Sequence, residues 1–322
     1  MDVLSDVLRM IHLEGALFLN GEFREPWCVD APDSANLVSA LRPGAQHLGI
    51  CHVVLEGQCW IQLKGGDPLL LQAGEAAVLA HGDTHLIGSG LRNAPVNLDH
   101  IVQVQLPELS RVRYGGAGER SVVACSWFAY EQGMTNPLIR SLPPLFRSSL
   151  NERAAGQWIK QSIQFALGEA ASRPPGGDVM AAKVAEMLFI EVLRAYIESL
   201  PELRSGWLSG LKDPQVGRAL RLLHGEPARP WTVETLAQEV HMSRSAFADR
   251  FNELIGMPPM QYLKRWRLSL AARLLANDRS TLAQVAEVIG YESESAFNRA
   301  FKQEYGKAPG LWRRVEAQAA KR

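Results

Sequence analysis

The chain has 322 residues, of which 47% are hydrophobic and 21% are charged, and its 34 basic and 34 acidic residues give a formal net charge of zero. This length suits two domains, and this composition excludes an intrinsically disordered chain. A net charge of zero at first argues against a nucleic-acid partner, but it is the sum of two opposed parts. Residues 212–322 hold 18 basic and 12 acidic residues, a net charge of +6, whereas the remaining residues hold 16 and 22, a net charge of −6. The basic C-terminal part suits contact with phosphate groups.

The N-terminus and the cysteines bear on where the protein works. Residues 1–19 carry Asp2 and Asp6 where a secretory signal would be basic, and their apolar positions recur at helical spacing, which predicts a short amphipathic helix. The most apolar later stretch, residues 180–200, contains five charged side chains, so we expect no membrane-spanning segment. The four cysteines form no CxxC pair and signal neither a disulfide framework nor a zinc ribbon. We expect a cytoplasmic protein.

Residues 15–130 consist of short apolar runs separated by turn signals, which predict an antiparallel sandwich or barrel. Two of these runs, 51–57 and 59–63, predict a hairpin around Gly57. The Val-Leu-Glu-Gly turn at 54–57 and the His-Gly-Asp-Thr-His block that ends at His85 resemble the cupin barrel, over residues 49–86. The resemblance implies a β-barrel domain that binds a ligand.

The cupin resemblance also raises a different function, that of a metal-dependent cupin enzyme with an accessory helical domain. It implies metal ligands from a His-x-His pair, from a Glu before the Val-Leu-Glu-Gly turn and from a His in the second block. Here His47 and His52 lie five apart, residues 44–55 contain no Glu, and only His85 falls on a ligand position. We therefore expect no metal and no cofactor, and we interpret these residues as turn or barrel histidines.

Four residues of the barrel are candidates for an effector pocket or a redox site, namely Cys51, His52, Trp60 and His85. Cys51 precedes His52, and an imidazole beside a thiol can lower the pKa of that thiol. Cys51 and Cys59 flank the predicted hairpin, and a short distance between them would suit a redox switch. Inert cysteines that fill the core are the alternative interpretation.

Helical spacing replaces the strand pattern after Tyr130. Residues 151–170 predict one helix, the Pro-Pro-Gly-Gly sequence at 174–177 ends it, and Asp178 can cap the next. The next helix, 179–200, has two apolar flanks, which predicts packing on the barrel and on a second copy of the chain in a homodimer. Packing within its own chain alone stays open as an alternative. Pro201 and the stretch 206–210 mark a linker.

The sequence after Lys212 contains two helix-turn-helix patterns that repeat each other. In the first, Thr232 and Ser243 cap two helices over about 232–255. In the second, Ser280 or Thr281 and then Ser293 do the same over about 281–305. The pairs at an offset of 50 are Phe247 with Phe297, Phe251 with Phe301, Gly256 with Gly306 and Pro259 with Pro309. Earlier positions pair at an offset of 49, so the second turn has one extra residue.

The helix predicted between the repeats, 259–275, and the segment 285–309 with its Ile289-Gly290-Tyr291 turn resemble the AraC/XylS family of bacterial transcription regulators. The resemblance covers residues 213 to about 314. It implies a sequence-specific DNA-binding transcriptional regulator, whose two recognition helices enter successive major-groove segments about 34 Å apart on a double-stranded DNA operator. It also implies an N-terminal cupin-like effector domain, RNA polymerase as a partner, and no enzymatic activity.

The second helix of each repeat contains the candidate DNA-binding residues. Its Phe residues face the core, which leaves the opposite side for DNA. The outward residues are Arg244, Ser245, Ala248, Asp249 and Arg250 in the first repeat and Glu294, Ser295, Asn298, Arg299 and Lys302 in the second. Arg299 is the leading candidate for a base contact, because Arg can bind guanine in a bidentate manner. Asp249 departs from the family pattern and would repel phosphate unless it accepts a hydrogen bond from cytosine or pairs with a neighbouring Arg.

These patterns together predict a multidomain α+β protein. We expect a cupin-like effector-binding domain at 1–130, a helical dimerisation or linker segment at 131–211, and an all-α DNA-binding domain with two helix-turn-helix motifs at 212–316. A small-molecule or redox signal sensed by the N-terminal domain would control the regulator.

Overall fold

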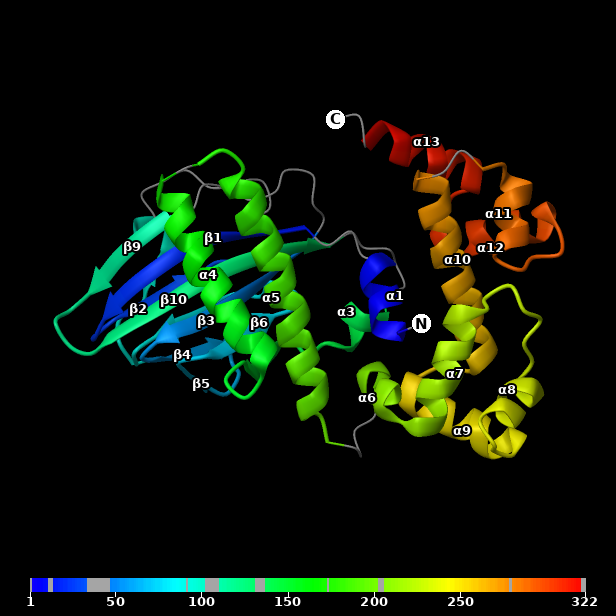
Figure 1. Cartoon of the computed structure of the whole chain (residues 1–322), viewed down its shortest axis with the longest axis horizontal. Coiled ribbons are helices and arrows are strands. Elements are labelled where there is room, and N and C mark those ends of the chain that lie inside the picture. The colour runs from blue at the N-terminus through cyan, green and yellow to red at the C-terminus, as the bar shows by residue number, and fades with distance from the viewer. Residues whose placement is uncertain are drawn as a thin grey trace. The chain divides into compact units, whose positions relative to one another are not determined.

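Figure 1 shows the computed structural model of the chain, which describes residues 2–10, 14–33, 47–90, 92–101, 110–130, 137–172, 174–201, 206–277 and 280–319. The chain forms two compact units. The sheet unit comprises residues 12–132 and 142–199, and the helical unit comprises residues 1–11, 133–141 and 200–322. The units cut across the three expected segments, because the long helices between 154 and 199 belong with the sheets, while two short segments from the first half of the chain belong with the C-terminal helices.

The sheet unit contains two sheets. The six-stranded sheet has the order β11-β6-β3-β10-β1-β9 and the five-stranded sheet the order β5-β4-β7-β2-β8. The strands are β1 (Glu14–Arg24), β2 (Cys28–Ala31), β3 (His47–Glu56), β4 (Gln58–Leu63), β5 (Leu69–Gln72), β6 (Glu75–Leu79), β7 (His85–Gly88), β8 (Val96–Asn97), β9 (Ser110–Gly115), β10 (Arg120–Tyr130) and β11 (Leu145–Ser149), and a short 3₁₀ helix, η1 (Leu98–His100), follows β8. The pairs β1 with β9 and β2 with β8 are parallel, and the other pairs are antiparallel.

An apolar core lies between the two sheets, because alternate side chains of each strand point inward. Ile50 and Val54 of β3 reach it from the six-stranded sheet, and Cys59 and Ile61 of β4 from the five-stranded sheet; all four are buried. The expected cupin-like β architecture is thereby confirmed.

The hairpin predicted around Gly57 is not formed. β3 pairs with β6 and β10, whereas β4 pairs with β5 and β7 in the other sheet. Gly57 has a φ of 71°, and a Cβ there would meet the backbone oxygen of Arg120 at 2.4 Å, so only glycine fits the turn. The chain therefore crosses between the sheets at Gly57. A tight turn between two apolar runs looks the same in sequence whether the strands pair or separate.

Two helices, α4 (Ala154–Ser172) and α5 (Gly177–Ser199), lie across the outer face of the six-stranded sheet (Figure 1). Phe189 of α5 packs on Phe128 of β10 with ring centroids 4.1 Å apart, and Tyr196 packs on Phe146 of β11 at 4.3 Å. Both apolar flanks of the helix predicted at 179–200 are thus largely used within the sheet unit. Most of the apolar surface of this helix is therefore not available for a homodimer contact. Only the apolar surface of its first turn remains exposed, with Val179 65% exposed.

The helical unit is built from ten helices within the described ranges. They are α1 (Val3–Met10), α3 (Pro137–Ser141), α6 (Trp207–Lys212), α7 (Pro214–Gly225), α8 (Val233–Glu239), α9 (Arg244–Ile255), α10 (Pro259–Asn277), α11 (Leu282–Val288), α12 (Glu294–Tyr305) and α13 (Pro309–Ala319). The N-terminal amphipathic helix is confirmed but short, since residues 14–24 form β1. Val3 and Val7 of α1 are buried where this helix packs against α7 and α10. Among the described residues, no helix has the length and apolarity needed to cross a membrane.

The two helix-turn-helix repeats are α8 with α9 and α11 with α12, and their caps are those expected from the sequence. Thr232 and Thr281 form capping boxes at the starts of α8 and α11. The hydroxyls of Ser243 and Ser293 accept hydrogen bonds from the backbone N–H three residues on, at 3.3 and 3.2 Å. Such caps stabilise a helix by about 1 kcal/mol each. His241 and Gly290 occupy the same left-handed position in the two turns, with φ 56° and 80°, and Met242 and Tyr291 form equivalent backbone hydrogen bonds, so the extra residue of the second turn is Glu292.

Candidate nucleic-acid interface and barrel cavity

The second helices of the repeats, α9 and α12, are the candidate recognition helices. Their inward Phe side chains are all fully buried: Phe247, Phe251, Phe297 and Phe301. Seven of the ten predicted DNA-facing residues are exposed, namely Arg244, Ser245, Asp249, Glu294, Ser295, Arg299 and Lys302, while Ala248, Arg250 and Asn298 are half-buried. The amphipathic placement expected from the sequence is therefore what the helices adopt. The contact of these residues with DNA stays a prediction.

The two cations of α9 are engaged in ion pairs. Arg244 pairs with Glu234 of α8. Arg250 donates from Nε and Nη2 to the Asp213 carboxylate, at 3.2 and 3.0 Å, and from Nη1 to Glu253 at 3.2 Å. Asp213 is also the N-cap of α7, where it accepts from two backbone N–H groups. Arg250 thus ties α9 to the start of α7, a role that its place on the outer face did not predict.

The two cations of α12 have a different environment. Arg299 and Lys302 are exposed, and neither has an ion-pair partner among the residues that the structure describes. The unpaired guanidinium of Arg299, in the middle of α12, keeps its donors for a base or a phosphate. α12 is therefore better prepared for a polar contact with DNA than α9.

A small cavity lies in the core of the sheet unit, with a volume of about 30 Å³. Apolar side chains from both sheets form most of its wall, and the polar side chains that reach it are His52, His85 and Cys125. Because a water molecule needs about 10–15 Å³ of such space, the cavity has room for about two atoms the size of water oxygen. It suits a very small, largely apolar guest.

His52, His85 and Cys125 form a hydrogen-bonded chain inside this core. His52 Nδ1 lies 2.9 Å from Cys125 Sγ, His52 Nε2 lies 2.8 Å from His85 Nε2, and His85 Nδ1 lies 2.9 Å from the backbone oxygen of Asp83. A carbonyl oxygen only accepts, so His85 Nδ1 donates to it, and neutral His85 accepts at Nε2. His52 then donates from Nε2 and accepts at Nδ1, which leaves the Cys125 thiol as the donor to His52. All three hydrogen bonds therefore donate in the same direction, from Cys125 through His52 and His85 to the backbone oxygen of Asp83.

Burial sets the protonation of these groups. It lowers the pKa of both imidazoles, that of His52 further because His85 lies beside it, and it raises the pKa of the Cys125 thiol. Both histidines are thus neutral at physiological pH. Charged groups lose solvation in such a core, so an uncharged guest fits it better than an ion.

The expectation that His52 lowers the pKa of Cys51 is wrong. Neighbouring residues of a strand point to opposite faces, so Cys51 lies on the other side of β3, where Ser126 is its hydrogen-bonding neighbour. Burial raises the pKa of Cys51 and of Cys59 to about 12 each. Trp60 is half-buried on β4 and, like Cys51, is not part of the cavity wall. Of the four candidates, the structure brings His52 and His85 together and adds Cys125.

Cys125 was missed because nothing local marks it. It lies 73 residues after His52 and meets it only because β3 and β10 pair with His52 opposite Cys125. Once that register is known, alternation places both side chains on the inner face of the same sheet. The inward alternation of Val123, Cys125 and Trp127 was the available signal.

The metal site of metal-dependent cupins does not fit these residues. Cys125 and His85 lie at opposite edges of the His52 ring, one at Nδ1 and the other at Nε2. One ion cannot bind both edges of one imidazole, so the three side chains do not converge on a common point. Within the described ranges, no three His, Cys, Asp or Glu side chains are grouped to hold a metal ion.

Comparison with protein families gives a match to each half of the chain. A family model described as Cupin matches residues 2–198, and one described as Helix-turn-helix domain matches residues 236–315. A putative AraC-like transcription regulator of Streptomyces lividans is 33% identical over 323 residues, covering 98% of this chain and 98% of its own. The HTH-type transcriptional regulator AlkR of Acinetobacter baylyi is 28% identical over 320 residues, covering 97% and 99%.

A solved structure also matches the C-terminal part. It is the DNA-binding domain of AdpA, described as a global transcriptional factor, in complex with a target DNA. Its sequence identity is 33%, its TM-score is 0.31, and the match covers 34% of this chain and 96% of that chain.

Proposed function

The chain belongs to the family of AraC-like transcription regulators, and we propose that it reads its operator by placing α9 and α12 in successive segments of the major groove. It is a DNA-binding regulator of transcription with an N-terminal cupin domain. The observation that carries the proposal is the repeat itself: two capped helix-turn-helix motifs joined by the single helix α10. Two recognition helices held in this way suit contacts about 34 Å apart, one turn of the duplex.

The proposed role of each basic residue on α9 and α12 follows from whether it is already paired with a carboxylate of the protein. Arg299 is proposed to bind a guanine edge, and Lys302 to bind phosphate. Arg244 can reach phosphate only by leaving Glu234, and Arg250 is proposed to hold α9 against α7 rather than to contact DNA. The proposed DNA contacts therefore fall mainly on α12, with α9 contributing through Ser245, Ala248 and Asp249.

Footprinting on a selected operator tests whether α9 and α12 occupy successive segments of the major groove. Duplexes would be selected from a random pool with the full chain, and hydroxyl-radical cleavage would map the contacts. We expect two protected zones on one face of the duplex, about ten base pairs apart, and an affinity that falls steeply with salt. A single protected zone, or uniform protection without sequence preference, would contradict it.

We also propose that the cavity of the sheet unit is where a small uncharged effector binds. Its apolar wall, its two neutral imidazoles and its volume of about 30 Å³ support a small guest that hydrogen-bonds to His52 or Cys125. The test is a screen of small uncharged molecules for a change in operator affinity of the full chain. His52→Leu should abolish the change, and Trp60→Leu, outside the cavity, should leave it intact.

An oxidant is a second candidate signal, favoured by one contact. Cys125 donates a hydrogen bond to His52, so among the barrel cysteines it is the one in contact with an imidazole, while burial raises its pKa and makes its reaction with an oxidant slow. If oxidant alters operator occupancy, Cys125→Ser should prevent the effect and Cys51→Ser should not. An unchanged response in the Cys125 variant would exclude this thiol as the sensor.

Partners of the regulator beyond DNA are proposed from the family and from one exposed surface. Trp158 and Phe165 of α4 are 52% and 57% exposed, and we propose that they, rather than helix 179–200, contribute the homodimer contact. Sedimentation of Trp158→Glu should then show a weakened dimer. From the family we also propose that the protein works in the cytoplasm and contacts RNA polymerase. In vitro transcription with purified polymerase would test this contact.

A further inference from the structure

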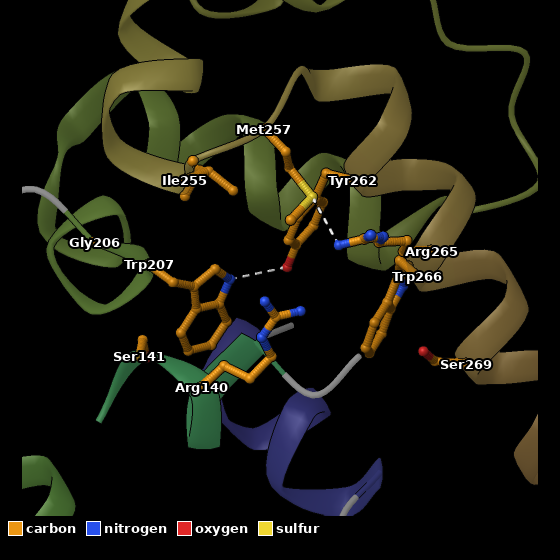
Figure 2. Close-up of a pocket in the computed structure, with 11 residues that line it drawn as sticks. Arg140, Ser141, Gly206, Trp207, Ile255, Met257, Tyr262, Arg265, Trp266 and Ser269 are labelled. Atoms are coloured by element: carbon orange, nitrogen blue, oxygen red, sulfur yellow. Dashed lines mark hydrogen bonds between the residues drawn. The ribbon is translucent and has the colours of Figure 1, made fainter. Parts of the chain in front are cut away.

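A second pocket, with a volume of about 310 Å³, lies in the helical unit (Figure 2). It is bounded by α3, by the start of α6, by the end of α9 and by the first half of α10. Its volume falls at the lower end of the range of about 300–1,000 Å³ in which proteins bind small molecules. The pocket contains none of the residues assigned to DNA or to the barrel cavity.

The charge of the pocket is positive. Two guanidinium groups line it, those of Arg140 and Arg265, and no carboxylate is among its lining residues. Arg140 is exposed and has no ion-pair partner in the described part of the chain. In Figure 2 its guanidinium extends from α3 into the space between Trp207 and Trp266. An unpaired guanidinium at a concave site favours an anion, and its fork matches a carboxylate.

Three aromatic rings form the apolar wall, and hydrogen bonds and stacking fix their positions. Trp207 Nε1 donates to the Tyr262 hydroxyl at 3.1 Å, and that hydroxyl lies 2.8 Å from His224 Nε2. Trp266 stacks on the His224 ring with centroids 3.7 Å apart. Because these rings are held before any guest enters, little side-chain entropy is lost on binding. Fixed aromatic walls favour a flat aromatic guest, which can stack on them.

We propose that this pocket binds a small aromatic carboxylate, with its ring against Trp207 and Trp266 and its carboxylate on Arg140 and Arg265. The ring supplies the stacking surface and the carboxylate supplies the partner that Arg140 lacks. An aliphatic carboxylate would lose the stacking, and a neutral aromatic would lose the charge-assisted hydrogen bonds. The site is distinct from the barrel cavity, whose neutral imidazoles and small volume do not suit an anion.

The pocket is lined by the end of one recognition helix and is linked to the other through an ion pair. Ile255 and Gly256, at the end of α9, are among its lining residues. Arg265 reaches the other recognition helix through Glu304 of α12, at 3.5 Å from Arg265 Nε. A bound carboxylate competes with Glu304 for Arg265. A ligand at this site would therefore act on the two helices directly, without passing through the sheet unit.

Calorimetric titration of the full chain with 1-naphthoate tests the site, with 1-naphthamide as the neutral analogue and octanoate as the aliphatic one. We expect 1-naphthoate to bind, and each analogue to bind at least about tenfold more weakly. Arg140→Met should weaken 1-naphthoate binding by about tenfold or more, since it removes a charge-assisted bidentate contact. Arg92→Met, an exposed arginine of the sheet unit, is the matched control and should bind as the wild type does.

A second variant gives a change in the opposite direction. Glu304→Gln frees Arg265 from its partner, so 1-naphthoate should bind about two- to fivefold more tightly. No binding by the wild type, equal binding of the amide, or unaltered binding by Arg140→Met would each overturn the proposal. The assay contains no DNA, so its failure would leave the proposed operator contacts untouched.

Discussion

The first and second helix-turn-helix repeats share one framework, and their recognition helices carry two basic and two acidic residues each, yet the two helices differ in whether the basic residues are paired. In both repeats a Thr capping box starts the first helix, a Ser caps the second, and a glycine in the left-handed region ends it, Gly256 with φ 75° and Gly306 with φ 70°. On α9, however, Arg244 and Arg250 are held by carboxylates of the protein itself. On α12, Arg299 and Lys302 have no such partner within the described residues.

The difference shows that a repeated fold does not imply a repeated function for equivalent helices. The framework residues are set by packing and capping, which are the same task in both repeats. The outer faces carry no such constraint. We expect the second repeat to supply most of the sequence preference and the first to supply position, and the following changes would break or sharpen this contrast.

The largest effect is expected where the repeats are most alike. Phe251→Ala and Phe301→Ala each remove a fully buried ring and should each lower the free energy of unfolding of their repeat by about 3–5 kcal/mol. Similar frameworks predict similar losses. Amide hydrogen exchange of α9 and α12 in the full chain would measure both. A loss in one repeat more than twice that in the other would show that the frameworks are not equivalent.

Operator binding should separate the repeats. Arg299→Ala is expected to cost about 1–3 kcal/mol at the selected operator and to relax the preference at one base pair. Arg244→Ala should cost less, because Arg244 must first leave Glu234. Titration of both variants against single-base operator variants is the measurement. If the Arg299 variant binds the operator as the wild type does across a range of salt, the base contact is wrongly assigned.

Acid should weaken the packing of α7 on α10 through His224, a buried histidine of α7 that stacks on Trp266. Burial lowers its pKa from 6.5 to about 3, so the folded state stays neutral while the unfolded state binds a proton below about pH 6.5. Stability is therefore full above this pH and falls as the pH drops, by up to about 1.4 kcal/mol per pH unit. Hydrogen exchange at pH 7 and 5.5 should show more lost protection in α7 than in α12.

The control for this pH effect is His224→Phe, which keeps a ring beside Trp266 but cannot titrate. His52 and His85 of the sheet unit are also buried and neutral, and they add an acid sensitivity of their own there. Comparison with the His224→Phe variant isolates the contribution of His224, which is the part of the pH dependence that the substitution removes. Equal pH dependence of α7 in the variant and the wild type would assign the effect elsewhere.

Local signals made the helical repeats predictable from sequence. A Thr or Ser cap, an apolar residue every three or four positions and a glycine after the last turn all act within a few residues. The caps at Thr232, Ser243 and Ser293 were therefore correctly predicted, as was the extra residue of the second turn. The presence of a β domain was predictable for the same reason, since turn residues and alternation are local.

Long-range pairing explains what the sequence did not reveal. The turn at Gly57 does not say whether its strands pair, and β3 and β4 entered different sheets. Cys125 meets His52 only through the register of β3 with β10, and Arg140 enters the pocket of the helical unit only because α3 packs beside α6. The charge state of the recognition helices has the same cause, as Asp213 lies 37 residues before Arg250.

The smallest effect is the most direct test of the contrast between paired and unpaired cations. Arg250 is already neutralised by Asp213, so Arg250→Met should change stability by less than about 1 kcal/mol and leave the salt dependence of operator affinity unchanged. Lys302→Met should instead lower the slope of log affinity against log salt by about one, as expected for one lost phosphate contact. Affinity measured for both variants over a salt series gives the two slopes. A slope reduced by Arg250→Met as much as by Lys302→Met would mean that Arg250 leaves Asp213 for phosphate on binding, and the first repeat would then present its charge only when DNA is bound.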